Sequence, residues 1–201
     1  MKKTLILAAA CILSLLAPQA GRADLVLTLS STTPDLTDLI VGQTVHFDVT
    51  LSGLDPQGIP SDLAFATADA GFDDTLLGSP TSVTPGAIIP DTASFIPVSN
   101  TGVAGMLYIG VDPIITNGIL FSFDVVAGAA GSGTVTILDA DFFDSAGNEF
   151  SGNGTFPGGI DISSSLRYAI HSEAVPEPST LVLLSLGGVV GLSARRFRRS
   201  D

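Results

Sequence analysis

The chain has 201 residues, one cysteine, no tryptophan and a formal net charge of −12. Seven of its eight basic residues lie in the first 22 or the last seven positions, so residues 24–178 hold 19 acidic residues and a single basic one, Arg167. Such a surface repels phosphate backbones and anionic lipids, which excludes nucleic-acid binding. The only cysteine, Cys11, precedes this body, which therefore has no disulfide and must fold on its hydrophobic core.

Residues 1–23 predict a signal peptide. Lys2 and Lys3 precede a mostly apolar stretch, 5–17, and the small residues Gly21 and Ala23 follow it. A charged start, a short apolar segment and a small-residue cleavage zone are typical of secretory signals. We expect a signal helix that signal peptidase removes, and export of the body across the inner membrane.

Residues 24–170 alternate apolar and polar side chains in short runs. The apolar members are Leu25, Leu27 and Leu29; Val45, Phe47, Val49 and Leu51; Leu107, Ile109 and Val111; Leu120, Phe121, Phe123 and Val125; Val135, Ile137, Ala140 and Phe142; and Ile160 and Ile162. Period-two alternation indicates half-buried strands with the apolar side toward the core. Turn clusters rich in Gly, Pro and Asn separate the runs. No segment of this body keeps a helical period over four turns. The pattern predicts an all-β fold, an antiparallel β-sandwich of the jelly-roll or cohesin-like type.

The body lacks the residue constellations that catalysis or a zinc site requires. His46 falls on the polar side of a strand, and His171 falls in 171–178, which is expected to be a linker. Neither has a second histidine or a thiol at metal-ligand spacing, and no Gly-x-Ser-x-Gly nucleophile elbow is present. We therefore expect no enzyme and no catalytic cofactor.

Four oxygen-bearing side chains near residue 140 leave two alternatives open. Asp139 and Asp141 are two residues apart and share one face of a strand, while Asp144 and Asn148 follow across a turn. These groups suit calcium, although the spacing is not that of an EF-hand. The alternative is an ordinary turn whose side chains cap backbone groups.

One aromatic side chain is a candidate ligand contact. In a strand, one of Phe142 and Phe143 must point away from the core. Phe143 is the candidate for an exposed position, where it would contact a ligand such as a polysaccharide.

The last 27 residues have three parts in a fixed order. Val175, Pro176, Glu177 and Pro178 come first, an apolar run over 179–194 follows, and Arg195, Arg196, Arg198 and Arg199 come last. Sixteen helical residues cover about 24 Å, which is short for a transmembrane helix but sufficient when arginines reach the membrane surface. Residues 179–201 therefore predict a transmembrane segment with a basic tail, and the arginines place that tail in the cytoplasm.

This three-part C-terminus resembles that of PEP-CTERM proteins. The resemblance covers about 27 residues and implies recognition by an exosortase, a membrane cysteine transpeptidase that processes the tail at the motif. It implies a cell-envelope or extracellular location, with the protein anchored in the membrane by its C-terminus until it is processed.

The order of segments in the body resembles that of cohesin domains, which are related to cellulose-binding sandwiches. The matching segments are Val41-Gly42-Gln43-Thr44-Val45, Asp62-Leu63-Ala64-Phe65, Val83-Thr84-Pro85-Gly86, 118–125, 133–137 and 144–150. The chain departs from the family pattern after Phe65, where residues 66–74 replace the usual alternating strand and its Tyr-Asp-Pro-like turn. For this reason we do not carry over the family's dockerin-binding face.

Together these observations predict an exported, exosortase-sorted protein of the cell surface or extracellular matrix. Its β-sandwich would be a non-catalytic interaction or adhesion module for exopolysaccharide or another surface protein. An exopolysaccharide-binding module is the first alternative, and a calcium-dependent adhesin is the second.

Overall fold

The computed structural model describes residues 25–55, 61–151 and 159–172. The expected signal helix, the transmembrane segment and the sorting motif with its arginines lie outside these residues. No helix within the described ranges is long and apolar enough to cross a membrane.

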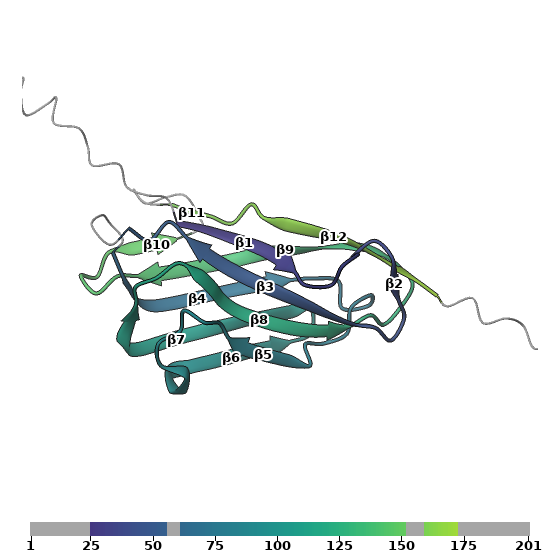
Figure 1. The fold of residues 1–201 in the computed structure, drawn as a ribbon, viewed down its shortest axis with the longest axis horizontal. Helices are drawn as coiled ribbons and strands as arrows, with labels where there is room; N and C mark the ends of the chain where they lie inside the picture. The colour runs from purple at the N-terminus through teal and green to yellow at the C-terminus, as the bar shows by residue number, and fades with distance from the viewer. Residues whose placement is uncertain (1–24, 56–60, 152–158, 173–201) are drawn as a thin grey trace, which may run out of the picture. The chain divides into compact units, whose positions relative to one another are not determined.

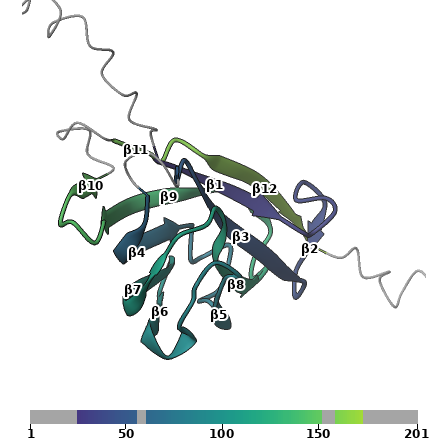
Figure 2. The same ribbon diagram turned by 60° about the vertical axis from the view of Figure 1, so that its left-hand side comes forward.

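Two β-sheets pack face to face (Figures 1 and 2). The first sheet has the order β11 (Ile160–Asp161), β1 (Leu25–Ser31), β3 (Thr44–Ser52), β8 (Gly118–Val126) and β5 (Ser82–Pro85). The second has the order β2 (Leu39–Ile40), β12 (Ser165–His171), β9 (Gly131–Phe143), β4 (Leu63–Gly71), β7 (Val103–Ile114) and β6 (Phe95–Asn100), and β10 (Glu149–Ser151) pairs with β9. A single 3₁₀ turn, η1 (Thr92–Ser94), precedes β6. This architecture confirms the predicted all-β sandwich.

Strand pairing is antiparallel except at two short edge strands. β11 pairs in parallel with β1, and β2 pairs in parallel with the end of β12. Both edge strands have two residues, so each pairs with only a short part of the neighbouring strand and exposes few unpaired backbone groups of its own.

Aromatic side chains, most of them from the first sheet, fill the space between the layers. Phe47 on β3 stacks on Phe123 of β8, with 5.2 Å between ring centroids, and Phe72 and Phe121 flank Phe123 at 6.1 Å. Phe47, Phe121 and Phe123 are fully buried. The alternation of β3 and β8 therefore marks the core face correctly, and burial of these rings supplies much of the hydrophobic stabilisation that a disulfide-free body needs.

β4 continues beyond the point where the sequence pattern seemed to end. The strand runs from Leu63 through Gly71, and Ala66, Ala68 and Ala70 point into the core. The expected departure from the cohesin pattern after Phe65 is thus a change of side-chain size within an intact strand. Small inward residues leave room for the large rings of the opposite sheet.

The apolar alternation on β7 faces outward, contrary to prediction. Ile109 is 58% exposed and Val111 is 96% exposed, while Met106 and Tyr108, which precede them on the other side of the strand, are buried. Leu107 shares the outward face and is partly buried. Both sides of this strand are apolar, so the pattern does not decide which one is buried, and the outward side needs another explanation.

Candidate functional site

The outward face of β6, β7, β4 and β9 carries three rows of side chains, each row running across neighbouring strands. Strand register sets the rows, because residues paired across a sheet point to the same side. The first row is Ile109, Phe65 and Phe143; the second is Ile96, Leu107, Thr67 and Asp141; the third is Val98, Gly105, Asp69 and Asp139. We call this surface the outer face.

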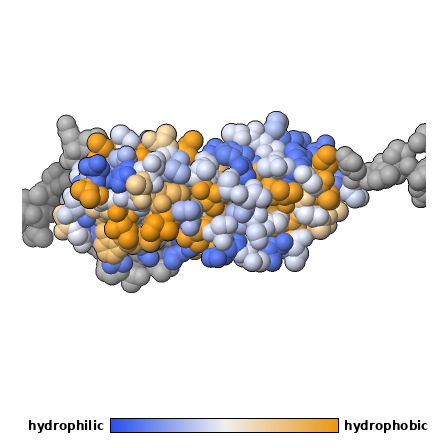
Figure 3. Space-filling model, turned by 90° about the horizontal axis from the view of Figure 1, so that it is seen from below, coloured by the Kyte–Doolittle hydropathy of each residue, from blue (hydrophilic) through white to orange (hydrophobic). Residues whose placement is uncertain are grey.

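The β6–β7 side of the outer face is apolar. Ile96 is 50% exposed, close to the exposure of Ile109 in the next row. Phe65 and Phe143 pack edge to face, with ring centroids 5.4 Å apart and planes at 81°. Figure 3, which views the body from the β5–β6 edge, shows larger groups of apolar side chains at one end of the molecule, broken by hydrophilic ones.

The β9 side of the outer face is acidic. Asp69 and Asp139 are register neighbours, and Asp141 follows Asp139 on the same face. Partial burial and the charge of Asp139 raise the pKa of Asp69. The Asp69 side chain lies over Gly105, where a Cβ atom would come within 1.9 Å of its Oδ1. The glycine therefore gives the carboxylate its place between β4 and β7.

The calcium residues predicted from sequence divide between the outer face and the turn after β9. Asp139 and Asp141 share a face, as expected. Asp144 is buried, and its two oxygens accept hydrogen bonds from the backbone N–H and the side-chain amide of Asn148, both at 2.7 Å. This is the geometry of the capped turn. Within the described residues, no group of three or more His, Cys, Asp or Glu side chains is arranged to hold a metal.

Phe143 and Phe142 point to opposite sides of β9. Phe142 is fully buried, and Phe143 lies on the outer face, partly covered by Phe65. Its position is compatible with the predicted ligand contact, which stays a prediction.

A second polar cluster lies on the outside of the other sheet, and sequence reasoning did not find it. His46 on β3 contacts Asp124 of β8 through Nδ1 at 2.6 Å and Asp48 through Nε2 at 3.1 Å. Ser82 donates to the second oxygen of Asp124 at 2.7 Å, and Ser122 donates to Asp48 at 2.5 Å. The polar side of β3 was visible in the sequence, but its pairing with β8 requires the register.

This histidine cluster is not a catalytic triad. Both ring nitrogens of His46 face carboxylates, so neither is available to accept a proton from a nucleophile. The hydrogen bond with Asp124 is the main cause that raises the pKa of His46, and partial burial opposes it. The cluster joins β3 to β8 through the His46 ring, and β5 to β8 through the hydrogen bond from Ser82 to Asp124.

Comparison with known proteins explains the C-terminus. A model of the PEP-CTERM protein-sorting motif matches residues 174–199. The chain carries a PEP-CTERM sorting motif. The motif implies export, sorting to the cell surface and processing by an exosortase. No curated protein matches this chain at a significant level.

Solved cohesin structures match the body. The third cohesin of ScaC from Acetivibrio cellulolyticus, in complex with the ScaB dockerin, is 14% identical with a TM-score of 0.56, covering 73% of this chain and 98% of that one. The cohesin of OlpA from Clostridium thermocellum, in complex with Doc918, is 13% identical with a TM-score of 0.55, and the match covers 74% of this chain and 99% of that one. A non-cellulosomal cohesin from Archaeoglobus fulgidus is 12% identical with a TM-score of 0.55, and the match covers 76% of this chain and 94% of that one. At these identities the similarity establishes a cohesin-like fold for the body of this chain and does not identify a partner.

Proposed function

We propose that the body is a non-catalytic interaction module whose outer face binds a protein at the cell surface or in the extracellular matrix. The observation that carries the proposal is the group of outward apolar side chains Ile96, Leu107 and Ile109, from two neighbouring rows, beside the Phe65–Phe143 pair. Soluble monomers expose few contiguous apolar patches, and such patches with aromatic residues at their centre are typical of protein interfaces.

The acidic side chains of the body favour a partner with a basic surface. Asp69, Asp139 and Asp141 border the apolar rows, and residues 24–178 carry 19 acidic residues against one basic. A partner with basic side chains around an apolar centre would complement this surface, and the field would speed its approach. The cohesins from A. cellulolyticus and C. thermocellum were solved in complexes with dockerins, which supports a protein partner over a glycan for this fold.

The experiment is capture from the producing cell's own envelope and matrix fractions on immobilised residues 24–178. In the test variant, Ile96→Ser and Ile109→Ser remove apolar side chains from the outer face. The matched control carries Ile40→Ser and Val41→Ser, since these residues are 41% and 42% exposed but lie away from that face.

We expect a protein that the parent and the control retain and that the outer-face variant loses, with at least about tenfold weaker binding when its affinity is measured. Equal retention by all three proteins would exclude the outer face as the binding surface.

The Phe65–Phe143 pair favours exopolysaccharide as a second candidate ligand, because aromatic faces stack on sugar rings. In this case the body binds purified exopolysaccharide from the producing strain, and Phe143→Ala abolishes the binding. Protein capture by the parent, with no polysaccharide binding by the parent, would favour the protein partner.

A further inference from the structure

The last residues of β12 are held by β2, a strand of two residues. Leu39 and Ile40 pair in parallel with Ile170 and His171. The backbone N–H of Val41 donates to the carbonyl of His171 at 3.2 Å. Leu39 and Ile170 are both buried, so the short pairing is closed by apolar packing as well as by hydrogen bonds. We call residues 36–41 together with 169–171 the exit clasp.

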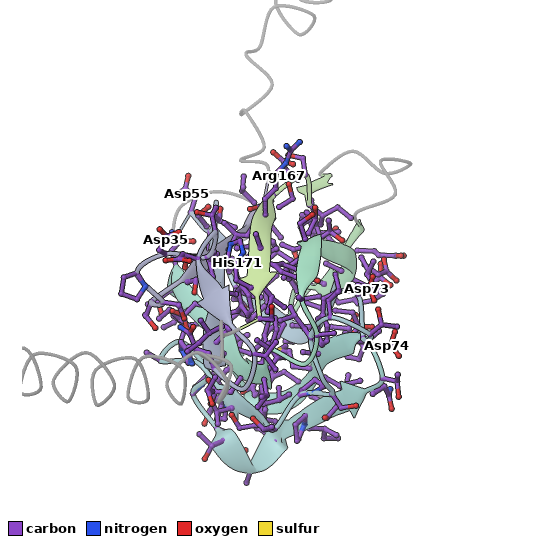
Figure 4. The ribbon with its side chains drawn as sticks, turned by 90° about the vertical axis from the view of Figure 1, so that its right-hand side faces the viewer. Asp35, Asp55, Asp73, Asp74, Arg167 and His171 are labelled. Atoms are coloured by element: carbon purple, nitrogen blue, oxygen red, sulfur yellow. The ribbon has the colours of Figure 1, made fainter. Side chains whose placement is uncertain are left out.

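The loop before β2 adds two contacts to the exit clasp. The N–H of Ala169 donates to the carbonyl of Leu36 at 2.8 Å, and Nε2 of His171 lies 3.2 Å from the carbonyl oxygen of Thr37. Figure 4 views the body from this end, with His171 near the centre and Arg167 on the same strand pointing to solvent. The last pair between β12 and β9 is Ile170 with Gly131, so β2 holds His171 beyond the reach of β9.

The sorting motif follows the exit clasp closely in the sequence. Its match begins at residue 174, and Pro176 comes five residues after His171. Four intervening residues span at most about 14 Å when fully extended. A transpeptidase binds its substrate as an extended segment on both sides of the bond it cuts. Backbone that is already paired in a sheet cannot enter such a site without local unfolding.

We propose that the exit clasp controls exosortase processing, because β2 must release the end of β12 before the enzyme can bind the chain on the N-terminal side of the motif. Release by β2 frees His171, and opening of the adjoining Ala169 and Ile170 pairs with β9 then lengthens the available segment from four residues to seven, which is about 10 Å more. The clasp suits this role because β2 has two residues, and Gly131 opposite Ile170 offers no side chain to hold the freed end. The inference rests on processing of the tail at the motif.

A disulfide across the exit clasp tests the proposal. Ile40→Cys and His171→Cys place two cysteines at register neighbours that are both exposed, in a body that otherwise has none. Adjacent strands lie about 5 Å apart, within the range a disulfide requires. The full-length protein is expressed in its exosortase-containing host, and intact mass of the cell-associated protein follows loss of the tail over time.

Three controls separate the clasp from other effects of the disulfide. Each single-cysteine variant reports the cost of the substitution alone. Thr28→Cys with Thr50→Cys joins register neighbours on β1 and β3, away from the exit clasp. Six Gly and Ser residues inserted after His171 in the locked variant supply free chain without opening the clasp.

The proposal predicts that the locked variant is processed at least about fivefold more slowly than the single-cysteine and β1–β3 controls. The insertion or a reductant restores the rate. Processing of the locked variant at the control rate would overturn the proposal, and so would slow processing that the insertion fails to restore. A parent that keeps its tail in this host would refute processing at the motif, and this inference with it, while leaving the capture experiment on the outer face unaffected.

Discussion

Replacement of His46 by Gln tests how much the second polar cluster contributes to stability. The substitution removes the titratable ring that lies between Asp124, 2.6 Å from Nδ1, and Asp48, 3.1 Å from Nε2. Hydrogen bonds to charged groups contribute about 1.5–3 kcal/mol each. Because the side chains of His46 and Asp124 are 37% and 33% exposed, solvent screening lowers the expected contribution of the cluster to about 1–2 kcal/mol.

The pH dependence follows from the direction of the two pKa shifts. The pKa of His46 is raised, chiefly by its hydrogen bond with Asp124, so its contribution is complete below its ordinary value of about 6.5 and is lost as pH rises through the folded-state pKa. Burial opposes ionisation of Asp124, but hydrogen bonds from Ser82 and His46 lower its pKa overall. The contribution of Asp124 is therefore lost as pH falls below about 4. The cluster stabilises the body most between about pH 4 and 6.5.

The assay is urea unfolding of residues 24–178 at pH 5, 7 and 9, for the parent and His46→Gln. We expect the largest difference in unfolding free energy at pH 5 and a clearly smaller one at pH 9. His171→Gln is the matched control, because this histidine is more exposed and its carboxylate neighbour Asp38 is 4.0 Å away. A difference for His46→Gln that stays constant from pH 5 to 9, or that grows with pH, would refute the reasoning.

Three further predictions follow from the outer face and the turn beside it. Phe142→Ala should lower the unfolding free energy by about 3–5 kcal/mol, and Phe143→Ala by no more than about 1 kcal/mol, because only Phe142 is fully buried; equal losses in urea unfolding would contradict this. Gly105→Ala should cost about 1–3 kcal/mol because the new Cβ meets Asp69, whereas Gly159→Ala has open space and should be close to neutral by the same measurement. Calorimetric titration of residues 24–178 with millimolar calcium should give no binding heat, because the buried carboxylate of the turn after β9 is engaged within that turn; a saturable heat would support the calcium-dependent adhesin instead.

The sequence predicts the sandwich because most strands have one clearly apolar side. β7 shows where this reasoning fails. Met106 and Tyr108 alternate with Leu107, Ile109 and Val111, so the strand is apolar on both faces and periodicity cannot assign the core side. The outer face was therefore hidden in a pattern that predicted burial. In a sheet with one solvent-facing side, a strand that is apolar on both sides must expose one of them, and this pattern could have indicated the outer face.

Weak side-chain signals and missing register explain the remaining differences. The alanines of β4 carry little strand preference, so the strand was not recognised beyond Phe65. β12 continues through His171, one residue into the expected linker, because β2 supplies a backbone partner. No local sequence pattern predicts that pairing. The His46 cluster joins residues 78 positions apart, and only the pairing of β3 with β8 brings them together.

The lone Arg167 has a consequence for survival outside the cell. Trypsin-like proteases cut after lysine or arginine, and between residues 24 and 178 this arginine is the single such point. It lies within β12, paired with Thr134 of β9, where the backbone is not free to enter a protease cleft. A folded body of this kind therefore resists digestion by an entire class of secreted proteases without any disulfide to protect it.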